Sequence, residues 1–186
     1  MTSSDVFRRI ISALEDAGIA HMLAGSFASS YHGSARATQD INLVIEADAR
    51  RLVALVQLLP PSAYYVDEGA ALEALQAETQ FNVVDLSAGW TIDLIIRRSR
   101  SFSVEEFTRR NMTDYEGTRL AIATAEDLII VKLERAKTGD LKRRIEDVVA
   151  MLRVRGEELD RDYIQRWVTA LDVDAQWVEA RRLAEA

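Results

Sequence analysis

Gly25-Ser26 and, a short distance later, Thr38-Gln39-Asp40-Ile41-Asn42 are the two stretches from which the fold of this chain can be predicted. Residues 19–24 form a short apolar run ending at the glycine, which is typical of a buried strand. Glycine at that point lets the backbone approach a ligand closely, and Ser26 can cap a short helix over residues 26–32. The free amides and positive dipole end of such a helix suit phosphate oxygens. A Gly-Ser pair alone is more often only a turn, so its meaning depends on the second stretch.

That second stretch opens a strand over residues 40–46, predicted by the alternation of Asp40, Asn42 and Glu46 with Ile41, Leu43 and Ile45. Successive side chains of a strand point to opposite faces, so Asp40 and Asn42 share one face. Residues 91–96 repeat the pattern around Asp93, and if the two strands are neighbours, the three polar side chains converge. Carboxylates that close repel one another unless a divalent cation neutralises them, and Mg²⁺ prefers such oxygen ligands. The sequence therefore predicts a Mg²⁺ site with Asp40, Asn42 and Asp93 as ligands.

Asp85 competes with Asp93 for the third position in this site. A tight turn at Ala88-Gly89 would pair Asp85 with Ile92 and place it on the face opposite Asp93, whereas one extra loop residue would reverse the faces. We therefore prefer Asp93. A lone aspartate at a strand end most often accepts hydrogen bonds from loop amides or pairs with an arginine. Only the combination of two polar-faced strands with an upstream Gly-Ser favours a site.

The rest of the chain predicts an α/β (α+β) core over residues 1–123 and a C-terminal helical segment or subdomain over residues 124–186. The expected core elements after the motif are a helix over 51–59, a helical stretch in 62–79, a hairpin of 81–86 with 91–96, and a strand at 119–123. Thr124-Ala125-Glu126-Asp127 resembles a capping box. The helices expected after it span 125–136, 140–153, 160–171 and 174–184.

Composition narrows the classes of function. The chain has 186 residues, a net charge of −7 and no cysteine. These values disfavour a disulfide framework, thiolate metal sites and high-affinity general binding to nucleic acid. No apolar run approaches the ~20 residues that cross a bilayer, so we expect no membrane partner and a cytoplasmic location. His21 and His32 are not spaced with acids as a zinc site.

Residues 22–45 together resemble the signature of the DNA polymerase β-like nucleotidyltransferase superfamily, in which a Gly-Ser precedes an Asp-x-Asp strand and a third aspartate lies on a later strand. The nearest resemblance is to the small bacterial minimal and AbiEii-type toxin nucleotidyltransferases, whose tail contains a segment similar to residues 125–133. The resemblance also takes in residues 91–95 and the tail to about residue 152. It implies the nucleotidyltransferase fold, with a mixed sheet flanked by helices.

The resemblance also implies roles for matched residues. Gly25 and Ser26 would hold a nucleoside triphosphate, Asp40 and Asp93 would bind Mg²⁺, and Asp93 would also act as the base on the acceptor hydroxyl. Three further residues are candidate nucleotide contacts: Arg36, Thr38 and Lys132. For the loop residues the alternative is a role in loop structure, and for the lysine it is an ordinary surface position.

Asn42 departs from the family pattern, because it stands where the second metal aspartate is expected. An amide oxygen can ligate a cation, but it brings no charge, so metal binding should be weaker. The leading hypothesis is transfer of a nucleoside monophosphate to a hydroxyl of RNA, protein or a small molecule, in a toxin–antitoxin context with an antitoxin partner. The alternatives are a catalytically impaired homologue that binds nucleotide or a protein partner, and a purely structural subunit.

Overall fold

The computed structural model describes residues 3–34 and 38–185, which divide into two compact units. Described residues of 3–25 and 38–122 form the first, which we call the sheet unit. Those of 26–34 and 123–185 form the second, the helical unit. The helical unit therefore contains residues 26–34 together with the C-terminal segment.

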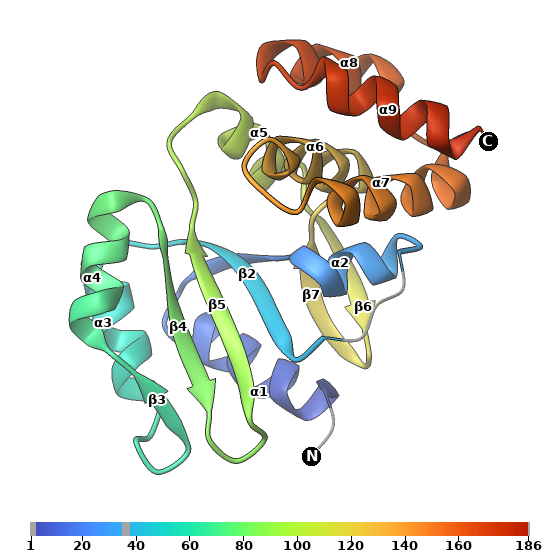
Figure 1. Cartoon of the computed structure of the whole chain (residues 1–186). Coiled ribbons are helices and arrows are strands. Elements are labelled where there is room, and N and C mark those ends of the chain that lie inside the picture. The colour runs from blue at the N-terminus through green and yellow to red at the C-terminus, as the bar shows by residue number, and fades with distance from the viewer. Residues whose placement is uncertain (1–2, 35–37, 186) are drawn as a thin grey trace. The chain divides into compact units, whose positions relative to one another are not determined.

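The sheet unit is built on a sheet whose described strands are ordered β3-β4-β5-β2-β1-β7-β6 (Figure 1). The strands are β1 Ala20–Ala24, β2 Asp40–Glu46, β3 Tyr64–Val66, β4 Gln80–Asp85, β5 Trp90–Ile96, β6 Asn111–Tyr115 and β7 Thr118–Ile122. The β2–β5 and β1–β7 pairs are parallel, and the other neighbours are antiparallel. The sheet is thus mixed, and β2 and β5 are neighbours, which meets the condition under which their polar side chains converge.

One face of this sheet holds the core of the unit. Ile41 and Leu43 of β2 and Ile92 and Leu94 of β5 have no exposed surface. The helices of the unit are α1 Ser3–Asp16, α3 Ala49–Leu58, α4 Glu68–Ala77 and α5 Ser101–Arg109. Two of these helices cover this face. α1 contacts β1 and β7, and α4 contacts β4. The alternate residues of β2 and β5 are only half-buried or exposed, so the opposite face carries the polar side chains.

Two short strands are absent from the sequence prediction. The three residues of β3 lie in a stretch expected to be helical or irregular, and β6 lies in a stretch without alternation. Both are edge strands, which have one neighbour and little core to bury, so their residues show no clear period. β6 forms a hairpin with β7 through Glu116 and Gly117, both with positive φ.

The helical unit contains α6 Ala125–Ala136, α7 Leu141–Arg155, α8 Arg161–Ala170 and α9 Asp174–Ala184, within a few residues of the prediction. The predicted cap of α6 is present: Thr124 Oγ1 accepts from the amide of Asp127 at 3.2 Å and donates to its carboxylate at 2.7 Å. Among the described helices, none is long and apolar enough to cross a membrane.

α2, Gly25–Tyr31, leads into three residues that bind the helical unit. His32 Nε2 donates to the carbonyl of Ala123 at 2.9 Å, and Ser34 Oγ donates to Asp147 Oδ1 at 3.1 Å. Between them Gly33 has φ +111°, and a Cβ there would lie 2.7 Å from Val154. These contacts explain why residues 26–34 belong with α7 and with the segment that leads into α6.

Candidate functional site

The centre of the candidate site is a side-chain pair across β2 and β5. The parallel register places Asn42 directly beside Asp93, and Asn42 Nδ2 donates to Asp93 Oδ2 at 3.0 Å. A second aspartate at position 42 would repel Asp93, whereas the amide donates a hydrogen bond to it. The pair is therefore held together without a cation.

Asp40 lies on the same face, at the first position of β2, where its register partner is Thr91. Its side chain is exposed. The loop before the strand is fixed locally, because Thr38 Oγ1 accepts from the amide of Asp40 at 3.1 Å. The structure thus brings Asp40, Asn42 and Asp93 to one face of two adjacent strands. Arg36 lies outside the described residues.

Gly25 connects the two motifs quoted from the sequence. It comes directly after Ala24, which is the register partner of Asn42, and its φ is +66°. A Cβ at this position would lie 2.4 Å from Asn42 Oδ1, closer than any side chain can approach. Both the backbone conformation and the proximity of the amide therefore require glycine.

Ser26 is the second residue of α2 and so lies inside the helix instead of capping it. Its carbonyl accepts a hydrogen bond from Ser30 Oγ at 3.0 Å. It belongs to the helical unit, while Gly25 belongs to the sheet unit. Its contact with a nucleotide stays a prediction.

Asp85 lies on the opposite face from Asp93 and has no exposed surface. Its register partner is Trp90 and not Ile92, because the loop at 86–89 is two residues longer than the expected tight turn. An even change in loop length preserves the face, which is why the inferred side was right although the partner was wrong. Asp85 Oδ1 accepts from the amides of Ser87 and Ala88, both at 3.0 Å, and Oδ2 pairs with Arg9 of α1. Asp85 therefore stabilises the hairpin.

Lys132 is not an ordinary surface lysine. Its side chain is 5% exposed, and Nζ lies 2.6 Å from Asp147 Oδ2 of α7. Burial lowers the pKa of the Lys132 ammonium, and the hydrogen bond that it donates to Asp147 opposes that shift. The same carboxylate accepts from Ser34, so the pair fixes the chain just before the loop that leads to β2. Contact of Lys132 with phosphates stays a prediction.

Two residues of the polar face were not identified from the sequence. Asn82 of β4 is the register partner of Asp93, and its side chain is exposed. Tyr65 of β3 lies on the same face and is 62% exposed. The alternation of residues 80–85 is the signal for Asn82. This alternation assigns Asn82 to the face of Asp93 only when the hairpin loop is known to contain an even number of residues.

The donors of this site fit a single Mg²⁺. They are the carboxylates of Asp40 and Asp93 and, after rotation of the amide whose nitrogen now donates to Asp93, the amide oxygen of Asn42. Mg²⁺ is commonly held by one or two carboxylates together with substrate phosphates and water. Within residues 3–34 and 38–185, no three histidine, cysteine or acidic side chains gather as a metal site. A two-carboxylate site completed by phosphate oxygens is therefore the arrangement that this donor set supports.

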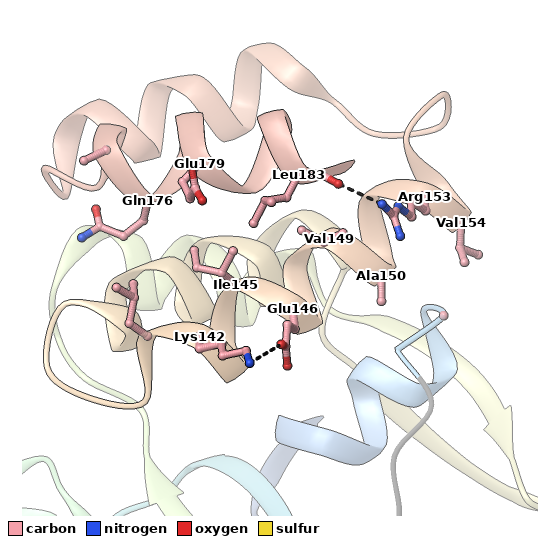
Figure 2. Close-up of a pocket in the computed structure, with 13 residues that line it drawn as sticks. Lys142, Ile145, Glu146, Val149, Ala150, Arg153, Val154, Gln176, Glu179 and Leu183 are labelled. Carbon is pink, nitrogen blue, oxygen red and sulfur yellow. Dashed lines mark hydrogen bonds and ion pairs between the residues drawn. The ribbon is translucent and has the colours of Figure 1, made fainter. Parts of the chain in front are cut away.

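A separate pocket of about 950 Å³ lies in the helical unit, between α7 and α9 (Figure 2). Ile145 and Val149 of α7 and Leu183 of α9 line it with aliphatic surface. Charged side chains border it, and Arg153 donates to the carbonyl of Leu183 at 2.9 Å. None of the predicted site residues that the structure describes lines this pocket.

Comparison with protein-family models and with curated proteins found no match. Solved structures do resemble the chain. ANT(2")-Ia in complex with adenylyl-2"-tobramycin has a TM-score of 0.61 and 13% identity, over 94% of this chain and 99% of that one. The lincosamide antibiotic adenylyltransferase LnuA, bound to lincomycin, has a TM-score of 0.55 and 11% identity, over 81% and 96%. A nucleotidyltransferase-like protein from Paracoccidioides brasiliensis has a TM-score of 0.53 and 13% identity, over 92% and 90%.

These likenesses define the fold of the chain. It is the nucleotidyltransferase fold, with a mixed sheet flanked by helices and a helical C-terminal segment, as the sequence predicted. At these identities, the likeness does not extend to a substrate or to the toxin group, and the AbiEii-type resemblance stays a prediction.

Proposed function

We propose that this protein transfers a nucleoside monophosphate from a nucleoside triphosphate to an acceptor hydroxyl in the presence of Mg²⁺. The observation that carries the proposal is the gathering of Asp40, Asn42 and Asp93 on one sheet face, with Gly25 against Asn42. The resemblance of residues 22–45 to the superfamily signature supports nucleotide and metal binding at this position. The likeness to two adenylyltransferase structures supports the same chemistry.

Each residue has a role in this proposal. Asp40 and Asp93 hold the cation, with Asn42 as a neutral third ligand. Mg²⁺ supplies charge neutralisation for the phosphate oxygens when it is bound. Gly25 and Ser26 hold the phosphates, and the candidate contacts Thr38 and Lys132 assist; Arg36, also a candidate, lies outside the described residues.

The chemical step consists of one displacement at the α-phosphorus. The acceptor oxygen forms a bond to that phosphorus while the bond to the bridging oxygen breaks, and pyrophosphate leaves. The proton of the acceptor hydroxyl passes to the carboxylate of Asp93, which acts as general base. Because Asp93 also accepts from Asn42 Nδ2, the amide holds the carboxylate in a fixed orientation.

The acceptor is a second part of the proposal. RNA, a protein side chain and a small molecule all offer a hydroxyl, and a toxin with an antitoxin partner is one biological context for the first two. The neighbours bound to adenylyl-2"-tobramycin and to lincomycin support a small molecule. A cytoplasmic location would give access to nucleoside triphosphates.

A catalytically impaired homologue is the second candidate function, and the hydrogen bond between Asn42 and Asp93 favours it. The pair is satisfied without a cation, so the site could bind nucleotide weakly or serve a protein partner. Such a protein would bind without transferring.

Labelled transfer separates the two candidates. Each α-labelled nucleoside triphosphate is incubated with Mg²⁺, cell extract and either wild type, Asp93→Asn or Asn42→Asp. The proposal predicts label in an RNA, protein or small-molecule fraction with wild type and none with Asp93→Asn. Transfer by Asn42→Asp alone would establish the impaired homologue, and transfer by Asp93→Asn would exclude the assigned base.

A further inference from the structure

We propose that the sheet face beside Asp93 binds the acceptor through Asn82 and Tyr65, and that the acceptor is a small hydroxylated ring compound, neutral or cationic, and not a nucleic acid. This inference rests on the proposed function. We call Tyr65, Asn82, Val84 and Thr91 the acceptor patch.

The strand register builds this patch. Asn42, Asp93 and Asn82 are successive partners across β2, β5 and β4. In the adjacent row, Asp40, Thr91, Val84 and Tyr65 are successive partners across β2, β5, β4 and β3. All seven side chains therefore point to the same face of the sheet. Asn82 is the immediate neighbour of the candidate base on the side away from Asn42.

The two sides of Asp93 differ in what can occupy them. On the β1 side, the backbone of Gly25 lies against Asn42, which suits the phosphates of the nucleotide. A nucleotide there leaves the β4 and β3 side for the acceptor. Strands are about 4.8 Å apart, so Tyr65 lies roughly 10 Å across the sheet from the β5 backbone. A compound of one or two rings can span that distance.

The patch side chains are available for binding. Asn82 is exposed and Tyr65 is 62% exposed. Within the described part of the chain, neither side chain makes a hydrogen bond, ion pair or ring contact. An exposed aromatic ring offers an apolar face to sugar-like rings, and an asparagine amide offers both donors and an acceptor to hydroxyl groups.

The charge of the face selects against a polyanion. The described residues of β2 to β5 on this face include the acids Asp40, Asp93 and Glu46, of which Glu46 pairs with Arg97 at 2.6 Å, and no lysine, arginine or histidine. Binding of nucleic acid depends on basic residues that neutralise phosphates. A neutral or cationic acceptor meets no such requirement, and without Mg²⁺ the carboxylates of Asp40 and Asp93 attract a cationic one.

Small sugars serve as probes of this patch. Glucose, glucosamine, glucose 6-phosphate and bulk tRNA are titrated into isotopically labelled full-length protein, and nuclear magnetic resonance follows the signals of Asn82, Thr91 and Tyr65. We expect glucosamine and glucose to shift these signals, with glucosamine the tighter of the two, and glucose 6-phosphate to bind at least several-fold more weakly. Equal or tighter binding of glucose 6-phosphate, binding of tRNA at these residues, or no binding by either neutral or cationic probe would overturn the proposal.

Variants assign the binding to the patch. Tyr65→Ala should weaken the binding of glucosamine about three- to tenfold, whereas Tyr65→Phe, which keeps the ring, should leave the affinity unchanged. Asn82→Ala should weaken it several-fold, and Met112→Ala, an equally exposed residue on the opposite edge strand, is the matched control. Equal affinity in wild type and Tyr65→Ala would contradict the assignment. Titration of ATP with Mg²⁺, followed at Gly25 and Asp93, tests the proposed function separately, because it needs no acceptor.

Discussion

At the scale of single residues, Asn42 is the side chain on which the candidate site is organised. Its amide nitrogen bonds to Asp93, and its amide oxygen lies on the side of Gly25, where a Cβ would be 2.4 Å away. One side chain thus links the strand that precedes α2 to the two strands that carry the carboxylates. Changes at Gly25 and at Asn42 should therefore affect each other.

Gly25→Ala tests the close approach. A left-handed backbone costs a non-glycine residue about 1–2 kcal/mol, and the new methyl group must also displace the Asn42 amide. Gly89→Ala is the control, because Gly89 has φ +68° with nothing within 4 Å of its Cβ. We expect chemical denaturation to show a larger loss for Gly25→Ala than for Gly89→Ala. Equal losses would mean that the proximity of Asn42 has no consequence.

Asn42→Asp tests whether the amide replaces a metal ligand. Without Mg²⁺, the variant should lose about 1–2 kcal/mol of unfolding free energy, because a like-charge contact replaces a hydrogen bond. Millimolar MgCl₂ should restore that loss in Asn42→Asp and change wild type less. Asn111→Asp adds the same charge on the edge strand β6 and should not respond to Mg²⁺. A variant as stable as wild type without Mg²⁺ would contradict this account.

At the scale of elements, the β4–β5 hairpin is held by a buried carboxylate. Asp85 bonds to two amides of its own loop and pairs with Arg9, so it ties the hairpin to α1. This is the role that a lone aspartate at a strand end most often has, and it distinguishes Asp85 from Asp93.

Asp85→Asn should therefore destabilise the fold while leaving the nucleotide site intact. Asp85 is buried but Arg9 is 37% exposed, so loss of the carboxylate charge should cost about 2 kcal/mol, less than in a fully buried pair. The exposed Asp40→Asn should change stability by less than about 0.5 kcal/mol. Urea unfolding compares them, and residual ATP binding by folded Asp85→Asn shows that the site survives. A larger loss of stability for Asp40→Asn would reverse the assignment.

His32 gives the helical unit a sensitivity to acid. Burial lowers its pKa from the ordinary 6.5, and His21 is lowered by the same cause. Nε2 of His32 bonds to Ala123, while Nδ1 is buried with no partner among the described residues. The unfolded chain therefore binds a proton that the folded chain does not, so stability falls as pH drops from about 6.5 toward the folded pKa. Above about pH 6.5 the imidazole is neutral in both states, so it no longer makes stability depend on pH.

Two glutamine variants measure this sensitivity. His32→Gln keeps a nitrogen donor for the Ala123 carbonyl but does not titrate near neutral pH. The decline in unfolding free energy from neutral pH to about pH 5 should be shallower in His32→Gln than in wild type. His21→Gln measures the second contribution, and the double variant isolates the carboxylates. An unchanged slope in the double variant would contradict the assignment.

The sequence predicts some elements well and others poorly, for physical reasons. Strands β2 and β5 alternate strictly because one face is fully buried, so their period and the side of each aspartate can be inferred. The edge strands β3 and β6 bury little and show no period. The assignment of Asn82 to the polar face depends on the length of the 86–89 loop, which composition does not determine. The burial of Lys132 could not be predicted from its own helix, because its partner Asp147 lies on another helix.

At the scale of the whole molecule, the chain crosses between its two units at residues 25–26 and returns before β2. The crossing falls on Gly25-Ser26, the first of the two stretches from which the fold was predicted. His32 then bonds to Ala123, just before α6, and Ser34 bonds to Asp147 of α7 before the chain returns to Asp40. The motif is therefore part of the connection between the two units as well as a candidate phosphate site.

Binding of nucleotide with Mg²⁺ tests the central claim most directly. Calorimetry measures ATP, GTP, CTP and UTP against wild type and Asp93→Asn, each with and without MgCl₂. The account predicts that at least one nucleotide binds wild type only with Mg²⁺, and that Asp93→Asn weakens this binding at least about tenfold, since a charged metal ligand is lost. Binding of none of the four, or equal binding by Asp93→Asn and without Mg²⁺, would contradict it.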